Sequence, residues 1–149
     1  MALHHLRTEV VINAPLDIVW RVLTDFESYP AWNPFIRSIS GRPLPGEKLQ
    51  VRIQPTGAKP MSFSPTVMAA EPGRELRWLG RVLLPGVFDG EHRFLLESTV
   101  EGRTHLVHSE QFKGVLVRFL RASLDGQTKA GFEEMNSALK RRAEELWLM

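Results

Sequence analysis

Residues 12–35 read INAPLDIVWRVLTDFESYPAWNPF, and this stretch decides how the fold opens. Pro15 suits the first turn of a helix, where its missing N–H leaves no hydrogen bond unmade. Asp17 falls in the same turn, where the helix dipole favours a negative charge. The apolar residues that follow have helical spacing and make one face, namely Leu16, Val19, Trp20 and Leu23. The pattern predicts a helix that ends near Thr24 or Asp25.

The second half of the stretch is rich in aromatic residues. Four of them lie within residues 26–35, together with Pro30 and Pro34. The two prolines exclude a long regular element. A loop with this much apolar area is expected to pack down on the protein, as a short second helix.

Alternating segments occupy most of the rest of the chain. Residues 5–13 predict a first strand, and residues 35–112 predict a meander of antiparallel strands with one covered face and one wet face. The expected turns are residues 41–46, 55–60, 71–74, 85–90 and 101–103. Residues 115–147 then have helical spacing, with a kink or break expected at Asp125-Gly126.

This order of elements predicts an α+β domain spanning residues 1–149. A curved antiparallel sheet of about seven strands would wrap around the long C-terminal helix. Such a helix-grip arrangement leaves room for an internal cavity between sheet and helix, where small molecules commonly bind.

Composition narrows the possible functions. The chain has no cysteine, which excludes disulfides and sulfur-based zinc sites. No run approaches the ~18 apolar residues of a membrane span, and residues 1–7 lack a signal-peptide core. With 19 basic and 17 acidic residues there is no strong basic bias toward nucleic acid. We therefore expect a cytoplasmic protein without nucleic-acid partners or stable membrane insertion.

Several runs resemble the SRPBCC, or START-like, superfamily, which includes polyketide cyclase/dehydrase-like and lipid-transport-like proteins. The resemblance lies in residues 12–20, 23–26, 29–35, 76–80, 89–94 and 110–114, in the correct order along the chain. It implies the helix-grip fold and a small hydrophobic ligand. It does not imply one activity, because this architecture serves carriers, cyclases and receptors alike.

His92, His108 and Glu110 are the candidate catalytic residues. With a three-residue loop at 101–103, Val100 would oppose Thr104 and the even-numbered residues of the two strands would share the apolar face. A His–Glu pair in an apolar cavity can act as a general acid or base. The structural alternative is that these groups are hydrogen-bonded at one end of the cavity, and it is the favoured interpretation.

Candidate ligand-binding residues are mostly aromatic or aliphatic. Asn33 is either a hydrogen-bonding handle for ligand or the cap of a turn before Pro34. Strand alternation sends Trp78 away from Arg77 and Arg81, against base stacking. The residues expected to line the hollow are Phe63, Trp78, Phe94, Phe112, Phe132, Met135 and Leu139.

Metal and nucleotide cofactors are not expected. His105 and His108 point to opposite faces of a predicted strand, and Gly80, Gly86 and Gly90 are too dispersed for a dinucleotide-binding loop. The apolar residues 82–88 form a cavity mouth, a membrane-touching tip or a dimer contact, or else fold back on the long helix.

The leading hypothesis is binding of a lipid-like, aromatic or polyketide-like molecule, by a monomer or homodimer. The first alternative is a cyclase- or dehydratase-type enzyme that uses the His–carboxylate pair. The second is a protein-interaction domain with a filled core. The sequence leaves open whether any reaction is catalysed.

Overall fold

A computed structural model describes residues 3–82 and 84–149. The strands are β1 (Leu3–Ile12), β2 (Ile36–Ser40), β3 (Gln50–Ile53), β4 (Met61–Phe63), β5 (Thr66–Glu71), β6 (Glu75–Val82), β7 (Phe88–Ser98) and β8 (Thr104–Lys113). The helices are α1 (Leu16–Thr24), η1 (Phe26–Ser28), α2 (Tyr29–Trp32), α3 (Val117–Ser123), η2 (Leu124–Thr128) and α4 (Lys129–Leu148). The α+β class and the long C-terminal helix are confirmed.

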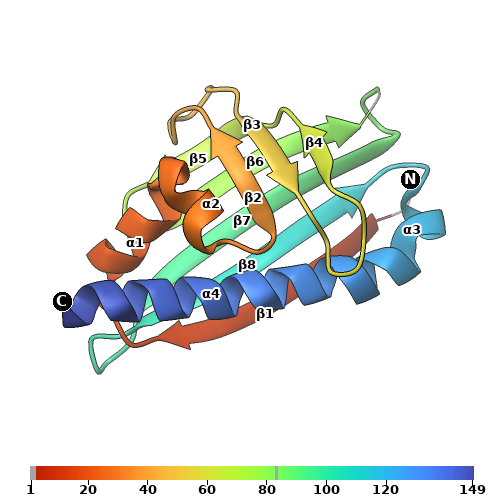
Figure 1. Ribbon diagram of the computed structural model, residues 1–149. Helices are drawn as coiled ribbons and strands as arrows, with labels where there is room; N and C mark the ends of the chain where they lie inside the picture. Colours follow the sequence, from red (N-terminus) through yellow and green to blue (C-terminus); the bar gives the residue numbers. More distant parts are fainter. Residues whose placement is uncertain (1–2, 83) are drawn as a thin grey trace.

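Two antiparallel sheets replace the single sheet of about seven strands. The larger has the order β1-β8-β7-β6-β5 and the smaller has β2-β3-β4. An isolated bridge between Lys48 and Thr66 links the segment before β3 to the first residue of β5. In Figure 1, α4 runs the length of the large sheet. Strands β2–β4 lie above α4 in the view. The described residues therefore contain eight strands in two sheets.

The core lies between the large sheet and the elements that cover it. The helical spacing predicted for this part of the chain is confirmed in α4, where Phe132, Met135, Leu139 and Ala143 form a buried stripe. Helix α1 begins and ends as expected, but its buried face is rotated. Ile18 and Val22 are buried with Val19 and Leu23, while Leu16 and Trp20 are half-buried.

The aromatic segment after α1 folds as predicted into short helices, η1 and α2. The Tyr29 hydroxyl donates a hydrogen bond to the Leu23 carbonyl over 2.5 Å, which ties α2 to the end of α1. The predicted break at Asp125-Gly126 is also confirmed, since a π-helical turn, η2, separates α3 from α4.

Two turn predictions need correction. Ser98, not Val100, opposes Thr104, so residues 99–103 connect β7 to β8. The shift is by two residues, which keeps the even-numbered side chains on one face. Asp89 and Gly90 belong to strand β7 rather than to the turn before it. The other members of the apolar 82–88 segment are described, but Leu83 lies outside the described residues.

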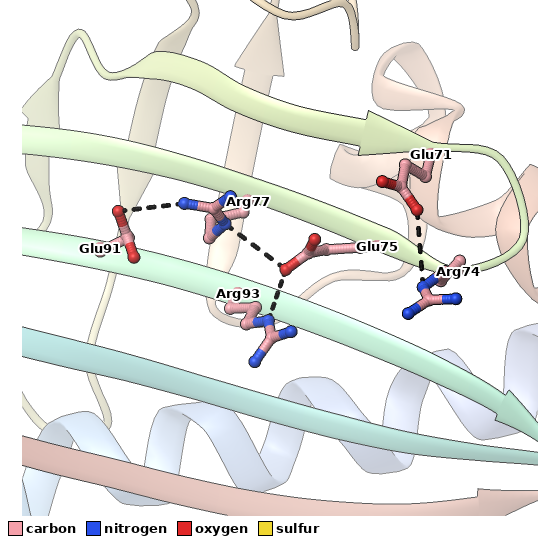
Figure 2. Close-up of polar contacts among 6 residues, drawn as sticks. All are labelled: Glu71, Arg74, Glu75, Arg77, Glu91 and Arg93. Carbon is pink, nitrogen blue, oxygen red and sulfur yellow. Dashed lines mark hydrogen bonds and ion pairs between the residues drawn. The ribbon is translucent and has the colours of Figure 1, made fainter.

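Charged residues on β6 and β7 mark the opposite face of the large sheet (Figure 2). The Glu75 carboxylate lies 2.5 Å from Arg93 Nε and 3.4 Å from Arg77 Nε, and Arg77 also reaches Glu91. These odd-numbered residues alternate with Trp78, His92 and Phe94, which face the core. The alternation predicted for these strands is confirmed, and Trp78 is separated from Arg77 as expected.

Candidate functional site

A cavity of about 320 Å³ lies between the two sheets and the segment that precedes α4. Its walls are mostly apolar. The lining includes Ile36, Val51, Ile53, Met61 and Phe63 from the small sheet; Trp78, Gly80, Phe88, Gly90 and Phe112 from the large sheet; and Leu120, Leu124, Gln127 and Thr128 from α3 and η2. A cavity is therefore present, but it lies between the two sheets and the α3–η2 segment, and no residue of the long helix α4 lines it as expected.

Two glycines make part of this hollow. Gly80 and Gly90 are directly paired across β6 and β7, and both line the cavity. A Cβ at position 80 would lie 3.2 Å from the Phe63 ring, and a Cβ at position 90 would overlap Glu110 Oε2. Their spacing in the sequence speaks only against a phosphate-binding loop. A glycine inside a strand pattern is itself a sign of close approach, and that sign identifies both.

Glu110 and His92 supply polar groups to the cavity lining. They are directly opposite each other on β8 and β7, because the register pairs position 92 with position 110. Glu110 Oε1 lies 3.1 Å from His92 Nδ1, and Glu110 keeps 15 % of its side-chain surface exposed. The predicted shared face thus places the carboxyl and the imidazole in hydrogen-bond contact.

His108 continues the contact away from the cavity. Its Nε2 lies 2.7 Å from His92 Nε2, and its ring is fully buried between two aromatic rings. The Phe132 ring stacks on it with centroids 4.1 Å apart, and the Phe94 ring stacks at 4.4 Å. His108 is therefore a partner of His92 and does not line the cavity.

Asn136 and Thr8 complete the hydrogen-bonded series. His108 Nδ1 lies 2.8 Å from Asn136 Oδ1, and Asn136 Nδ2 donates to Thr8 Oγ1 over 2.8 Å. Thr8 Oγ1 donates to the backbone carbonyl of His108, also over 2.8 Å. Neither residue was predicted from the sequence. Asn136 carried a usable signal, because it is a polar residue on the buried stripe of α4 between Phe132 and Leu139.

Burial sets the protonation of this series, which we name the Thr8–Glu110 relay (Thr8, Asn136, His108, His92 and Glu110). Burial raises the pKa of Glu110 to about 8 and lowers the pKa of His92 to about 3. The pKa of His108 is well below its ordinary value, first because of burial and then because of the neighbouring His92. The side chains of the relay are accordingly uncharged near neutral pH.

The predicted ligand-binding residues divide into two groups. Phe63, Trp78 and Phe112 line the cavity. The other apolar residues of the set are fully buried core residues that are not part of its lining, namely Phe94, Phe132, Met135 and Leu139. Phe94 and Phe132 still serve the site, because they enclose His108.

Asn33 has the geometry of its turn-capping alternative. Its Oδ1 accepts hydrogen bonds from the backbone N–H groups of Phe35 and Ile36, over 2.9 and 2.8 Å. Its Nδ2 is buried and has no partner among the described residues. The side chain therefore shapes the turn that leads into β2.

The apolar 82–88 segment lies at one end of the cavity, since Val82 and Phe88 are part of the lining. Leu84 is exposed, so the segment does not fold back entirely on the protein. Within residues 3–82 and 84–149, no cluster of three or more potential metal ligands occurs. No helix in the described part of the chain is long and apolar enough to cross a membrane.

Comparison with protein families gives one match that spans most of the chain. Residues 4–144 match the family model described as polyketide cyclase/dehydrase and lipid transport. No curated protein sequence matches the chain.

Solved structures share the fold at low sequence identity. The Zhui aromatase/cyclase from Streptomyces sp. R1128 is 18 % identical with a TM-score of 0.78, over 97 % of this chain and 95 % of that one. A START superfamily protein from Mycobacterium smegmatis is 22 % identical with a TM-score of 0.69, over 96 % and 99 % of the two chains. The di-domain aromatase/cyclase StfQ of the steffimycin pathway is 12 % identical with a TM-score of 0.78, and this chain spans 53 % of it. At these identities the likeness concerns the fold alone.

Proposed function

The chain belongs to the polyketide cyclase/dehydrase and lipid transport family, and on that premise we propose that it binds a small hydrophobic molecule in the cavity between its sheets and η2. The molecule would be lipid-like, aromatic or polyketide-like. The observation that carries the proposal is an apolar cavity of about 320 Å³ with a buried carboxyl in its wall. Mostly apolar walls with a few convergent polar groups are typical of small-molecule sites.

Two features support binding over a purely structural role. Gly80 and Gly90 both line the cavity, and they leave room for two side chains that also line it, Phe63 and Glu110. Protein interiors are otherwise close-packed, so a hollow of this size is unusual in a core that serves stability alone.

The first test is native mass spectrometry of protein purified from its own host, with extraction of any bound molecule. We expect an apolar molecule to co-purify with the wild-type protein. Leu120→Trp narrows the cavity from α3 and should lose that molecule, whereas Phe119→Trp changes an exposed neighbour outside the lining and should keep it. Equal retention by both variants would place the molecule elsewhere.

A cyclase- or dehydratase-type reaction is a second candidate, and the relay favours it. A carboxyl whose pKa is raised to about 8 is poised for proton transfer near neutral pH. Glu110→Gln keeps the shape of the side chain but cannot exchange a proton in this way. For an enzyme it should lower the rate by roughly 10²–10⁴ with ligand affinity little changed. For a carrier no rate is lost, and ligand binding persists.

A further inference from the structure

One end of the relay fixes the direction of its hydrogen bonds. A backbone carbonyl can only accept a hydrogen bond, so the Thr8 hydroxyl donates its single hydrogen to the carbonyl of His108. Thr8 Oγ1 must then accept from Asn136, which requires the amide nitrogen Nδ2 on that side. With the amide reversed, Thr8 would face two acceptors with one hydrogen. The orientation of Asn136 follows from this count.

The same count of donors and acceptors determines which nitrogen of each imidazole carries a hydrogen. Asn136 Oδ1 accepts from His108 Nδ1, so Nδ1 carries the hydrogen of the neutral ring. His108 Nε2 is then a lone pair that accepts from His92 Nε2–H. In neutral His92 this leaves Nδ1 without a hydrogen.

The donor of the hydrogen bond between His92 and Glu110 is assigned last. His92 Nδ1 accepts, so the hydrogen between the two residues comes from Glu110 Oε1. If that proton moves to His92, Glu110 becomes a carboxylate and the other bonds are unchanged. In both forms Glu110 Oε2, the oxygen over Gly90, carries no hydrogen. Oε2 makes no hydrogen bond with any described residue, and both Glu110 and Gly90 line the cavity.

We propose that the cavity selects molecules that donate a hydrogen bond, such as phenols, enols or alcohols, to Glu110 Oε2. This rests on the proposed function, because it names the ligand class of the same cavity. A ligand with only an ether or carbonyl oxygen at this point would set two acceptors against each other.

The test compares 2-naphthol with 2-methoxynaphthalene by isothermal titration calorimetry at pH 6.5. The two molecules share an apolar bicyclic body, and only the first donates a hydrogen bond. Leaving a buried polar group unpaired costs about 1–3 kcal/mol, so we expect 2-naphthol to bind about 5- to 150-fold more tightly. Equal binding, or tighter binding of the ether, would overturn the donor preference.

Three variants connect the preference to Oε2. Glu110→Gln should keep it, because the amide can donate N–H to His92 and present its oxygen to the cavity. Glu110→Met should abolish it by weakening only 2-naphthol. Gly90→Ala should do the same, because the new Cβ would overlap Oε2 and displace it. Circular dichroism confirms that each variant is folded before titration.

The outcomes separate the two proposals. If both molecules bind wild-type protein equally and Leu120→Trp weakens both, the cavity binds apolar molecules but the donor preference is wrong. If neither molecule binds, the proposed binding function fails together with the preference. If the preference survives in Glu110→Met, the hydrogen bond is made elsewhere and the assignment to Oε2 is overturned.

Discussion

The Nε2 atoms of His92 and His108 lie 2.7 Å apart, and a single hydrogen joins two buried imidazoles. Two lone pairs at this distance would repel, and two N–H groups would clash. The pair therefore depends on groups beyond it to fix which ring donates. Asn136 does this for His108, and Glu110 does it for His92.

Replacing Asn136 with leucine should destabilise the protein. The change leaves His108 Nδ1–H and Thr8 Oγ1 without Asn136 as their partner inside the core. We expect a loss of about 2–4 kcal/mol in the free energy of unfolding, measured by urea denaturation. Ser137→Ala changes the exposed neighbour on α4 and should cost less than ~0.5 kcal/mol. A loss below 1 kcal/mol for Asn136→Leu would show that the relay does not stabilise the fold.

Stability above pH 6.5 should depend on Glu110. Its pKa is about 8 in the folded protein and ordinarily 4.5, so only the folded state keeps the proton between these values. The folded state therefore binds more protons, and stability falls as pH rises through 8, by at most about 1.4 kcal/mol per pH unit. Glu110→Gln should remove this decline in urea denaturation at a series of pH values. An unchanged slope would mean that Glu110 is ionised in the folded protein.

Below pH 6.5, His92 and His108 change the stability of the protein with pH in the opposite direction to Glu110. Burial lowers the pKa of His92 to about 3, and that of His108 is lowered too, so the unfolded chain binds the extra protons. Stability should rise with pH up to about 6.5 in both wild type and Glu110→Gln. Wild-type protein then has a maximum near pH 6.5, whereas the variant reaches a plateau.

The outer face of the sheet offers a test of partly buried ion pairs. Glu75 is 12 % exposed and lies between Arg77 and Arg93, whereas Glu71 is 64 % exposed and, among the described residues, forms an ion pair only with Arg74 (Figure 2). Glu75→Ala should lower the free energy of unfolding by about 1 kcal/mol, less at high salt, and Glu71→Ala should have almost no effect. Equal effects in urea titrations would contradict a role for burial.

Sequence periodicity was sufficient to predict most helices and strands and the shared inner face of β7 and β8. The alternation along β7 and β8 put His92, His108 and Glu110 together, because parity survives a turn that is two residues longer than expected. It did not separate residues that line the cavity from residues packed behind it. Trp78 and Phe94 have the same pattern on neighbouring strands, and only packing with the rest of the chain distinguishes them.

Long-range hydrogen bonds also could not be predicted from periodicity. Thr8 and Asn136 are 128 positions apart, and nothing local pairs them. The close approach of Phe63 to Gly80 and of Glu110 to Gly90 depends on the missing side chains of the two glycines, and alternation carries no information about it. A polar residue on a buried helical stripe and a glycine inside a strand are the two signals that would have added these residues.

Two glycines in the C-terminal helical segment should respond oppositely to the same change. Alanine in place of glycine favours a helix by about 1 kcal/mol. At Gly131 the new Cβ would lie 2.5 Å from Phe35 Cδ1, in a buried ring that packs edge-on against Phe132. At Gly126, in η2, a new Cβ would meet nothing within 4 Å.

We therefore expect Gly126→Ala to raise the thermal unfolding midpoint and Gly131→Ala to lower it. Overpacking a core costs about 1–3 kcal/mol, which exceeds the gain in helix propensity at position 131. Because Phe35 also lines the cavity, Gly131→Ala should weaken ligand binding, whereas Gly126→Ala should not. Calorimetry measures both quantities for each variant. A raised midpoint for Gly131→Ala would show that the Phe35 ring moves freely, and the cavity wall would then be softer than its packing implies.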